Sequence, residues 1–250
     1  MKKKFNFISL SQIDSTNNYA KNLIENNKNI DEWTVIDTKF QFAGRGQEGN
    51  TWESENNKNL TFSIILKPDF LKPSNQFKLN KVISLGVVDF LQKYSIANVK
   101  IKWPNDIYVE NKKIAGILLE NIISGDKYSF CIAGIGVNIN QENFSEKITN
   151  FTSLKKITGK EYIRRQCLNV LLNCLYARYY QLVKSPEIID CDYHNNLYLL
   201  EEKRKYIIKN TKTVATIKGI NEYGLLQLQK DDNSIIYCDF KEIIFLSVEE

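Results

Sequence analysis

The 250-residue sequence is poor in the side chains on which most metal sites and many nucleophilic mechanisms depend. It contains one histidine, His194, and five cysteines that form no C-x-x-C pair. Structural zinc sites need several Cys and His ligands at short spacing. A Ser-His-Asp or Cys-His mechanism would depend on His194, which lies in a helical pattern without a nucleophile motif beside it. We therefore expect a structural histidine and small, buried thiols in a reducing compartment.

Long apolar segments are also missing. No run approaches the roughly 18 residues that a membrane-spanning helix needs. The basic N-terminus is followed by an apolar stretch, residues 5–10, that is too short for a signal peptide and is typical of a first strand. With 43% hydrophobic and 25% charged residues, the composition is that of an ordinary globular protein. We expect a cytoplasmic protein without a membrane partner, built as one large domain or a main domain with a small appendix.

Strong charge of either sign is absent. The net charge is +5, and residues 201–250 contribute −1 of it, with eight Lys or Arg and nine Asp or Glu. The excess in the first 200 residues suits an anionic ligand, although a composition rich in lysine and asparagine could produce it alone. Because no basic helix or basic-aromatic stripe is present, the sequence does not indicate nucleic acid as a partner.

The most unusual stretch present is a glycine loop, residues 41–52, between apolar strands expected at 33–40 and 59–66. It contains three glycines in six residues, with Arg45 among them. Successive backbone N–H groups in such a loop can bind an anion, to which the arginine adds a fixed charge. The G-x-G-x-x-G spacing is not a dinucleotide fingerprint, because no helix follows, and no Gly-Lys-Ser/Thr makes it a Walker loop. An ordinary surface Ω-loop is the alternative.

Asp14-Ser15-Thr16-Asn17 precedes a helical pattern. Asp14 or Ser15 can cap that helix, which we favour over ligand binding. The same hydroxyl and amide groups could instead hold a polar ligand against the exposed N–H groups of the helix.

A rigid corner is expected at residues 102–106, Lys-Trp-Pro-Asn-Asp, after a short strand at 99–102. Proline fixes its own φ and biases the preceding residue away from helix. The corner would present Lys102, Asn105 and Asp106. A plain turn explains the same residues, since Pro-Asn-Asp is ordinary turn chemistry.

A hairpin is expected from strands 107–110 and 113–121. Strict alternation would place Lys113, Ala115, Ile117 and Leu119 on one face, with an ammonium at the rim of an apolar wall. This arrangement suits an acid with an apolar tail, or it is an edge lysine that extends into water. The next strand, 128–140, carries Gly134 and Gly136, and two glycines in a strand indicate close approach of a ligand or of another segment.

Residues 152–200 have helical periodicity. After residue 200 the period changes to two, and five short strands are expected at 206–208, 213–220, 224–229, 234–239 and 243–247. The sequence therefore predicts an α+β domain over residues 1–203 and a small β-barrel over residues 204–250.

Taken in order, D-S-T-N, Q-x-A-G-R-G-x-x-G-x-x-W, K-W-P-N-D, K-I-A-G-I-L-x-E and G-I-G-V-N-I-N resemble the biotin protein ligase (biotin–[acetyl-CoA-carboxylase] ligase) family. The resemblance is strong over residues 5–140. It implies an α+β fold similar to class II aminoacyl-tRNA synthetases, with a mixed antiparallel sheet backed by helices and an SH3-like C-terminal domain. It also implies that the protein uses ATP and Mg²⁺ to convert biotin to biotinyl-5′-AMP and passes biotin to a lysine of a biotin carboxyl carrier protein.

The resemblance implies roles for individual residues. The biotin ureido end would be held by Ser15, Thr16, Asn17 and Gln41. The biotin-binding loop would be formed by Gly44, Arg45, Gly46 and Gln47, with a backbone contact at Gly116. Arg45 and Lys113 would be the catalytic cations, Lys113 contacting the biotin carboxylate and the α-phosphate. The ATP side would comprise Lys102, Trp103, Asn105, Asp106, Gly134 and Asn138, with Asp106 as a candidate Mg²⁺ ligand.

Two departures from the family pattern matter. The catalytic pattern begins at Phe5 without the helix-turn-helix that many members carry before it, so we expect no DNA recognition. Gln47 and Asn50 stand where the family loop often has arginine. A lipoate–protein ligase and a non-catalytic biotin-binding module are the alternatives, and a homodimer is left open.

Overall fold

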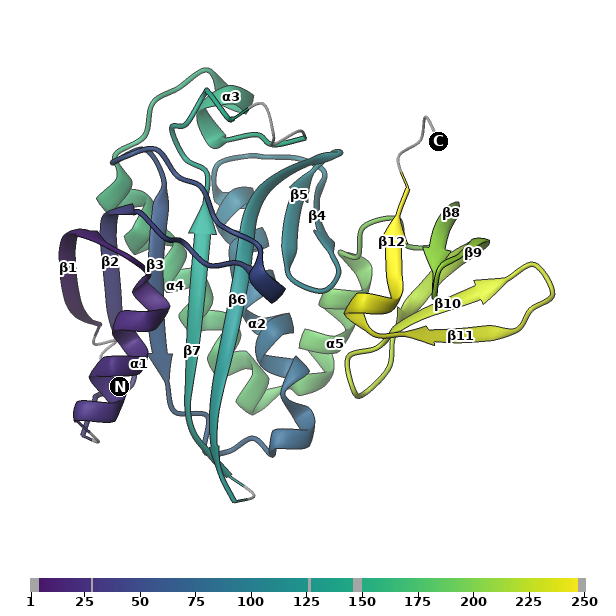
Figure 1. Ribbon diagram of the computed structural model, residues 1–250, viewed down its shortest axis with the longest axis horizontal. Coiled ribbons are helices and arrows are strands. Elements are labelled where there is room, and N and C mark those ends of the chain that lie inside the picture. The colour runs from purple at the N-terminus through teal and green to yellow at the C-terminus, as the bar shows by residue number, and fades with distance from the viewer. Residues whose placement is uncertain (1–4, 28, 126, 146–149, 247–250) are drawn as a thin grey trace.

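The structure, a computed structural model, describes residues 5–27, 29–125, 127–145 and 150–246. Two sheets of very different size are joined along the chain (Figure 1). None of the helices in these ranges is long and apolar enough to cross a membrane.

The larger sheet has seven strands in the described residues, in the order β1-β2-β3-β7-β6-β5-β4. Strands β1 and β2 are parallel and every other neighbouring pair is antiparallel, so the sheet is mixed as expected. The strands are β1 (Asn6–Ile13), β2 (Thr34–Gln41), β3 (Leu60–Leu66), β4 (Val99–Lys102), β5 (Asp106–Val109), β6 (Lys112–Ser124) and β7 (Lys127–Val137).

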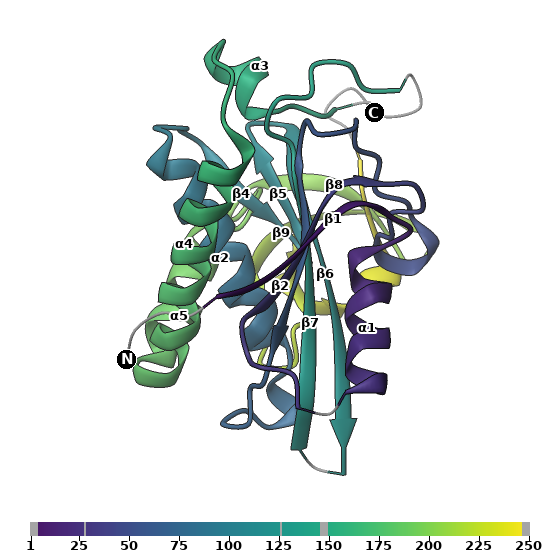
Figure 2. The same ribbon diagram turned by 90° about the vertical axis from the view of Figure 1, so that its left-hand side faces the viewer.

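Helices cover both faces of this sheet unequally (Figure 2). In the residues that the structure describes, α1 (Thr16–Asn26) is the one α-helix on one face, whereas α2 (Phe77–Lys93), α4 (Arg164–Lys184) and α5 (Pro186–Asn195) lie on the other. The large core forms on the three-helix side, where alternate β7 residues such as Ala133 and Ile135 point. The expected helical stretch 152–200 thus divides into α3 (Leu154–Thr158), α4 and α5, and the single-turn helix η2 (Pro73–Asn75) precedes α2.

A β-bulge corrects the expected facing of strand β6. Tyr108 pairs with Lys113 but Ile107 pairs with Ala115, so Ile114 is an extra residue in β6. The insertion reverses the alternation, and Ala115 and Ile117 pack into the helix-side core while Lys113 lies on the α1 side. The expectation of one face shared by Lys113, Ala115, Ile117 and Leu119 was therefore wrong. The residues that share the α1 side with Lys113 are Gly116 and Leu118.

The second sheet is antiparallel and, within the part of the chain that the structure describes, has five strands in the order β11-β10-β9-β8-β12. They are β8 (Lys203–Ile208), β9 (Thr211–Ile220), β10 (Leu226–Lys230), β11 (Ile235–Cys238) and β12 (Ile243–Phe245). This confirms the five expected short strands and the SH3-like appendix, although Ser247, the expected end of the last strand, lies outside the described residues. The domain boundary at 203/204 stays a prediction.

The small sheet is packed firmly against the large domain. Its buried side chains, among them Tyr206 and Leu226, belong to the same core cluster as those of α2 and α4. Trp103, at the corner between β4 and β5, donates its indole N–H to the Gly224 carbonyl at 2.9 Å. The single-turn helix η3 (Phe240–Glu242) and strand β12 are thereby held beside the corner, where they contribute to the site.

Candidate functional site

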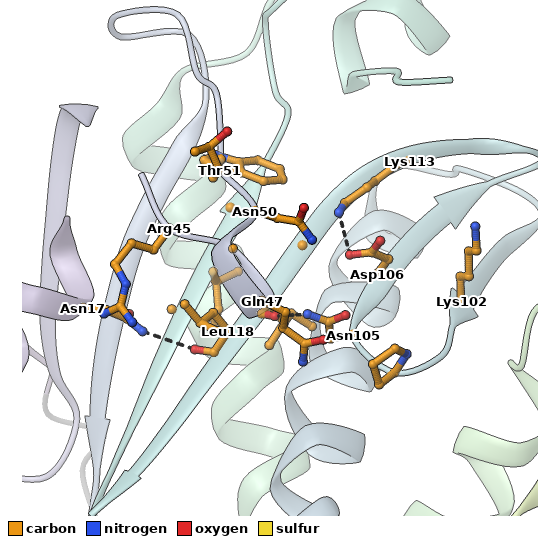
Figure 3. A pocket seen from close by; sticks show the side chains of 18 of the residues that line it. Asn17, Arg45, Gln47, Asn50, Thr51, Lys102, Asn105, Asp106, Lys113 and Leu118 are labelled. Atoms are coloured by element: carbon orange, nitrogen blue, oxygen red, sulfur yellow. Dashed lines mark hydrogen bonds and ion pairs between the residues drawn. The ribbon is translucent and has the colours of Figure 1, made fainter. Parts of the chain in front are cut away.

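A cavity of about 330 Å³ lies on the α1 side of the large sheet, within the size range of small-molecule sites. Its lining comes from the start of α1, the glycine loop, the β4–β5 corner, strands β6 and β7 and the small sheet. Figure 3 shows labelled side chains from α1, the loop, the corner and β6. Every site residue predicted from the sequence lines it except Gly44 and Asn138. The predicted residues in the lining are Ser15, Thr16, Asn17, Gln41, Arg45, Gly46, Gln47, Lys102, Trp103, Asn105, Asp106, Lys113, Gly116 and Gly134.

One end of the cavity is a neutral, buried hydrogen-bonding cluster. The side-chain oxygen of Gln41 accepts from the backbone N–H of Thr16 at 2.7 Å and from its hydroxyl at 3.0 Å. The Ser63 hydroxyl lies 2.7 Å from the Thr16 hydroxyl and 2.6 Å from the Asn17 amide oxygen, and with one proton it donates to one of them at a time. Ser15, Thr16, Asn17, Gln41 and Ser63 are all at most 8% exposed.

This cluster corrects the expected capping of α1. Ser15 occupies the N-cap position, but its side chain makes no capping hydrogen bond. Gln41, from the end of β2, accepts the first helical N–H instead. The helix start and the glycine loop are therefore tied together by a residue 25 positions away. Ser63 was missed because an alternating apolar strand gives no sign that one hydroxyl meets a helix terminus.

Glu120, which was also missed, connects the cluster to the loop cation. Its carboxylate accepts from the Asn17 amide at 2.6 Å and forms an ion pair with Arg45 at 3.0 Å. Arg45 also donates to the Asn18 side chain at 2.8 Å. Figure 3 shows the Arg45 guanidinium directed toward Asn17 and away from Lys113. The only sequence signal for Glu120 was its place at the end of K-I-A-G-I-L-x-E.

The glycines of β6 and β7 make room for Trp52. A Cβ atom at Gly136 would lie 2.3 Å from the Trp52 ring, and one at Gly116 would lie 3.2 Å from it. A Cβ atom at Gly134 would lie 2.3 Å from the Asn17 amide oxygen. The close approach predicted from these glycines is therefore made by the protein's own side chains. The indole N–H of Trp52 is buried without a hydrogen-bond partner among the described residues, so it is a donor available to a ligand.

The opposite end of the cavity carries two lysines. Lys113 forms an ion pair with Asp106 at 2.6 Å (Figure 3), and its ammonium lies 5.9 Å from the ring centroid of Trp52. The Lys102 ammonium lies between two aromatic rings, 4.9 Å from Tyr108 and 5.0 Å from Phe245. Burial lowers the pKa of Lys102, and the nearby Asp106 carboxylate opposes that shift. This end of the cavity is suited to anionic groups.

The small sheet closes the lysine end. Four of its apolar residues complete the lining, namely Phe240, Ile243, Ile244 and Phe245. No local pattern in the sequence marks them, because their role depends on how the small sheet packs against the β4–β5 corner. Asn105 stabilises that corner, since its side-chain amide donates to the Ile117 carbonyl and its own carbonyl accepts from the Ile117 N–H at 3.0 Å.

Gly44 and Asn138 support the site from outside the lining. A Cβ atom at Gly44 would lie 2.4 Å from the Trp52 carbonyl oxygen, so this glycine allows the loop to close on itself. Asn138 is 1% exposed, donates its amide to the Thr152 carbonyl at 3.0 Å, and donates its backbone N–H to the bulged Ile114 at 2.9 Å. Neither residue lines the cavity, and the predicted contact of each with a ligand stays a prediction.

The lining offers a single carboxylate to a metal ion. No group of three or more His, Cys, Asp or Glu side chains that could hold a metal is found in the described residues. Asp106 is the only acidic residue that lines the cavity in the described part of the chain. Mg²⁺ is commonly bound by one or two carboxylates together with phosphate oxygens and water. This donor set fits a Mg²⁺ ion that arrives with a phosphate ligand.

Fold and site together define a mixed α+β protein with a cavity that has neutral polar groups at one end and two lysines at the other. Residues 9–140 match the model of the biotin/lipoate A/B protein ligase family. This match covers more than half of the chain, and the protein therefore belongs to that family.

Named relatives agree with this assignment. The chain is 33% identical over 171 residues to the bifunctional ligase/repressor BirA of Bacillus spizizenii, covering 67% of this chain and 51% of that protein. It is 34% identical over 132 residues to the biotin–[acetyl-CoA-carboxylase] ligase of Paracoccus denitrificans, covering 52% of this chain and 53% of that one. The chain thus matches about half the length of these relatives.

A solved structure is similar over almost the whole chain. The biotin protein ligase from Aquifex aeolicus in complex with biotin and ATP has a TM-score of 0.79 and 29% identity. The match covers 96% of this chain and 97% of that one, so it includes the small C-terminal sheet as well as the large domain.

Proposed function

We propose that this protein joins biotin to AMP with ATP as the donor and then transfers biotin to a lysine of a biotin carboxyl carrier protein. The observation that carries the proposal is the polarity of the cavity. Neutral hydrogen-bonding groups gather at one end around Thr16, Asn17 and Gln41, and Lys113 and Lys102 lie at the other. Biotin has the same polarity, with a neutral urea at one end and a carboxylate at the other.

The neutral cluster suits the urea. A urea offers two N–H donors and one carbonyl acceptor, and the amide and hydroxyl groups of Thr16, Asn17, Gln41 and Ser63 provide both kinds of partner without a net charge. Trp52 and Leu118 would contact the apolar rings and chain, whereas Leu119, part of the wall expected from the sequence, does not line the cavity. The reverse orientation would place the carboxylate among buried neutral groups, at an end where Arg45 is already paired with Glu120, and burial of a carboxylate without a cation of its own is costly.

Lys113 and Arg45 would act on the first chemical step. A biotin carboxylate oxygen forms a bond to the α-phosphorus of ATP while the bond from that phosphorus to the leaving pyrophosphate breaks. Two anions must meet in this step, and a positioned cation lowers the energy of that encounter. Lys113 lies at the correct end of the cavity for this role, and its pairing with Asp106 holds the ammonium there.

Arg45 would have to exchange partners to take part. It is paired with Glu120 at the urea end, so its contribution requires the guanidinium to turn toward the ligand. Mg²⁺, when bound through Asp106 and the phosphate oxygens, would supply further positive charge to the phosphates.

The second step needs no side-chain nucleophile from this chain. The amine of the carrier lysine attacks the acyl carbon of biotinyl-5′-AMP, an amide bond forms, and AMP leaves with the electron pair of the broken acyl–oxygen bond. Holding the adenylate and excluding water are sufficient tasks for the protein in this step. We propose the carrier domain as the protein partner and no DNA partner, given the modest net charge of +5.

A lipoate–protein ligase is the nearest alternative. Lipoate has a carboxylate but no urea, and it would leave the cluster around Thr16 and Gln41 without partners for its remaining donors and acceptors. The four neutral polar side chains at that end favour biotin. A non-catalytic biotin-binding module would have no use for Lys102 and Lys113 facing the same cavity.

The test is release of pyrophosphate from ATP and Mg²⁺ in the presence of biotin, with lipoate and no acid as the two controls. We expect release that depends on biotin and exceeds that with lipoate, followed by a mass increase of an apo carrier domain. Release with lipoate alone would favour the alternative enzyme. Biotin binding without pyrophosphate release would favour the binding module.

A further inference from the structure

Arg164 occupies an unusual position outside the cavity. It is the first residue of α4, and its guanidinium donates three hydrogen bonds to one small region of the chain. The Nε atom donates to the Asn59 carbonyl at 2.6 Å, Nη2 to the Thr38 carbonyl at 2.9 Å, and Nη1 to the Asn57 side chain at 3.0 Å. The planar, five-donor geometry of arginine is suited to such a fork of acceptors.

These acceptors mark the point where β2 and β3 separate. The ladder between the two strands runs from Thr34 paired with Ile65 to Asp37 paired with Phe62. Beyond it, one backbone hydrogen bond still joins the two segments, from the Asn57 N–H to the Lys39 carbonyl at 2.8 Å. Thr38 and Asn59 flank the opening, and the chain between them contains the whole glycine loop. Arg164 therefore joins the two ends of the segment that carries Gln41 and Trp52 into the cavity.

The placement of this cation has a cost that the three hydrogen bonds must offset. Burial lowers the pKa of Arg164, and the Asp37 carboxylate opposes the shift. A positive charge at the N-terminus of a helix is also unfavourable, because that end of the helix dipole is positive. An ordinary helix start would carry an acidic or neutral residue here.

We propose that Arg164 is a positioning residue for the glycine loop, residues 41–52. It fixes the separation of β2 and β3 so that Gln41 and Trp52 are held in their binding geometry. The biotin readouts of this inference rest on the proposed function. Gln41 lies three residues after Thr38 on the same strand, so a shift of Thr38 would pass directly to the contact between Gln41 and the start of α1.

The same helix contains a matched control. Arg178 is also half-buried, and its guanidinium pairs with Asp89 of α2 and with Asp192 of α5. None of these three residues lines the cavity. Loss of Arg178 removes a comparable set of charge-assisted bonds from the helix layer, without touching the loop.

The experiment compares Arg164→Lys, Arg164→Met and Arg178→Met in the full chain. The three measurements are the melting temperature, the KM for biotin and kcat for pyrophosphate release, and the hydrogen exchange of residues 42–57. We expect Arg164→Met to raise the KM for biotin about tenfold and to speed exchange in this segment, as expected for the loss of a charge-assisted network. Arg164→Lys should lie between it and wild type, because lysine retains the charge but not the fork.

Arg178→Met should lower the melting temperature by a similar amount while its KM for biotin stays within about twofold of wild type. Equal KM values for Arg164→Met and Arg178→Met at a similar loss of melting temperature would overturn the inference, since Arg164 would then be structural only. If wild type releases no pyrophosphate, the proposed function fails, and the exchange measurement alone decides about Arg164. Unchanged exchange of residues 42–57 in Arg164→Met would then refute the positioning role of Arg164.

Discussion

Lys113→Met is the substitution that tests the proposed chemistry most directly. Methionine retains an unbranched apolar stem that can fill the space beside Trp52, but it removes the ammonium that faces the ligand. The fold should survive, because the partner of Lys113 is a half-buried Asp106 and not a fully buried group. The proposed adenylation step should be slowed severely, since two anions would meet without that cation.

The size of the effect follows from the environment of Lys113. Its side chain is 20% exposed and that of Asp106 is 25% exposed, so the local dielectric lies between that of water and that of a dry interior. Two unit charges about 4 Å apart at an effective dielectric constant of about 20 interact by about 4 kcal/mol. Removal of one preorganised donor at a developing charge costs roughly 3–4 kcal/mol in other enzymes. We therefore expect a barrier increase of about 3 kcal/mol, which is roughly a hundredfold in rate.

The assay is single-turnover pyrophosphate release with saturating biotin and ATP, with the melting temperature measured in parallel. Lys81→Met is the matched control, because Lys81 pairs with Asp190 at 2.7 Å and lies 5.7 Å from the Tyr193 ring, away from the lining of the main cavity. It should lose a similar amount of stability and retain its rate. A rate for Lys113→Met within about threefold of wild type, less than 1 kcal/mol in barrier, would refute the assigned role.

Three further outcomes are expected from the same site. Glu120→Gln keeps an acceptor for Asn17 but frees Arg45 from its ion pair. It should lower the KM for ATP about threefold, which corresponds to the free energy of a partly exposed ion pair. A raised KM in steady-state kinetics would contradict this. Gln47→Arg adds a charge-assisted bond to the loop and should slow release of biotinyl-5′-AMP about fivefold in a chase experiment, whereas equal release rates would mean that the missing arginine is compensated. Burial lowers the pKa of Lys102, so its charge is lost as pH rises at a value below the ordinary 10.5. The basic limb of the pH profile of kcat/KM for ATP should therefore begin below pH 10.5, and it should move upward in Lys102→Arg. A basic limb that does not move would assign this titration to another group.

Local periodicity was sufficient to place most elements. The expected strands at 33–40 and 59–66 are β2 and β3 within one residue at each end, because apolar runs bounded by polar segments leave few alternatives. The change from a helical period to a period of two after residue 200 correctly predicted the second sheet.

The facing of β6 shows where periodicity fails. A strand that alternates strictly from Lys113 to Leu119 would put the lysine on the helix side of the sheet. The bulge at Ile114 moves it to the cavity, and the bulge coincides with pairing of Lys113 to the segment at Phe151, which forms a parallel bridge beside it. Nothing within residues 113–119 encodes that neighbour, so the inversion could not be read locally.

Most candidate site residues line one cavity, because they lie in short motifs whose backbone geometry is local. Their partners were not predicted. Arg45 was expected at the anionic centre and instead lies against Glu120, 75 positions away. The glycines at 134 and 136 did indicate close approach, but only the packed structure shows that Asn17 and Trp52 are what approach them.

The sequence by itself determined the elements, the loop that interrupts the sheet, and the set of residue types from which a site could be built. The tertiary structure decided which of these residues face one another. Lys102 and Phe245 are far apart in the chain, yet the Lys102 ammonium lies 5.0 Å from the centroid of the Phe245 ring in the cavity. Arg164 donates hydrogen bonds to the carbonyls of Thr38 and Asn59, each more than a hundred residues away in the chain. The reason is physical: backbone preferences and side-chain periodicity act over a few residues, whereas burial of a shared core brings together segments whose separation along the chain carries no local signal.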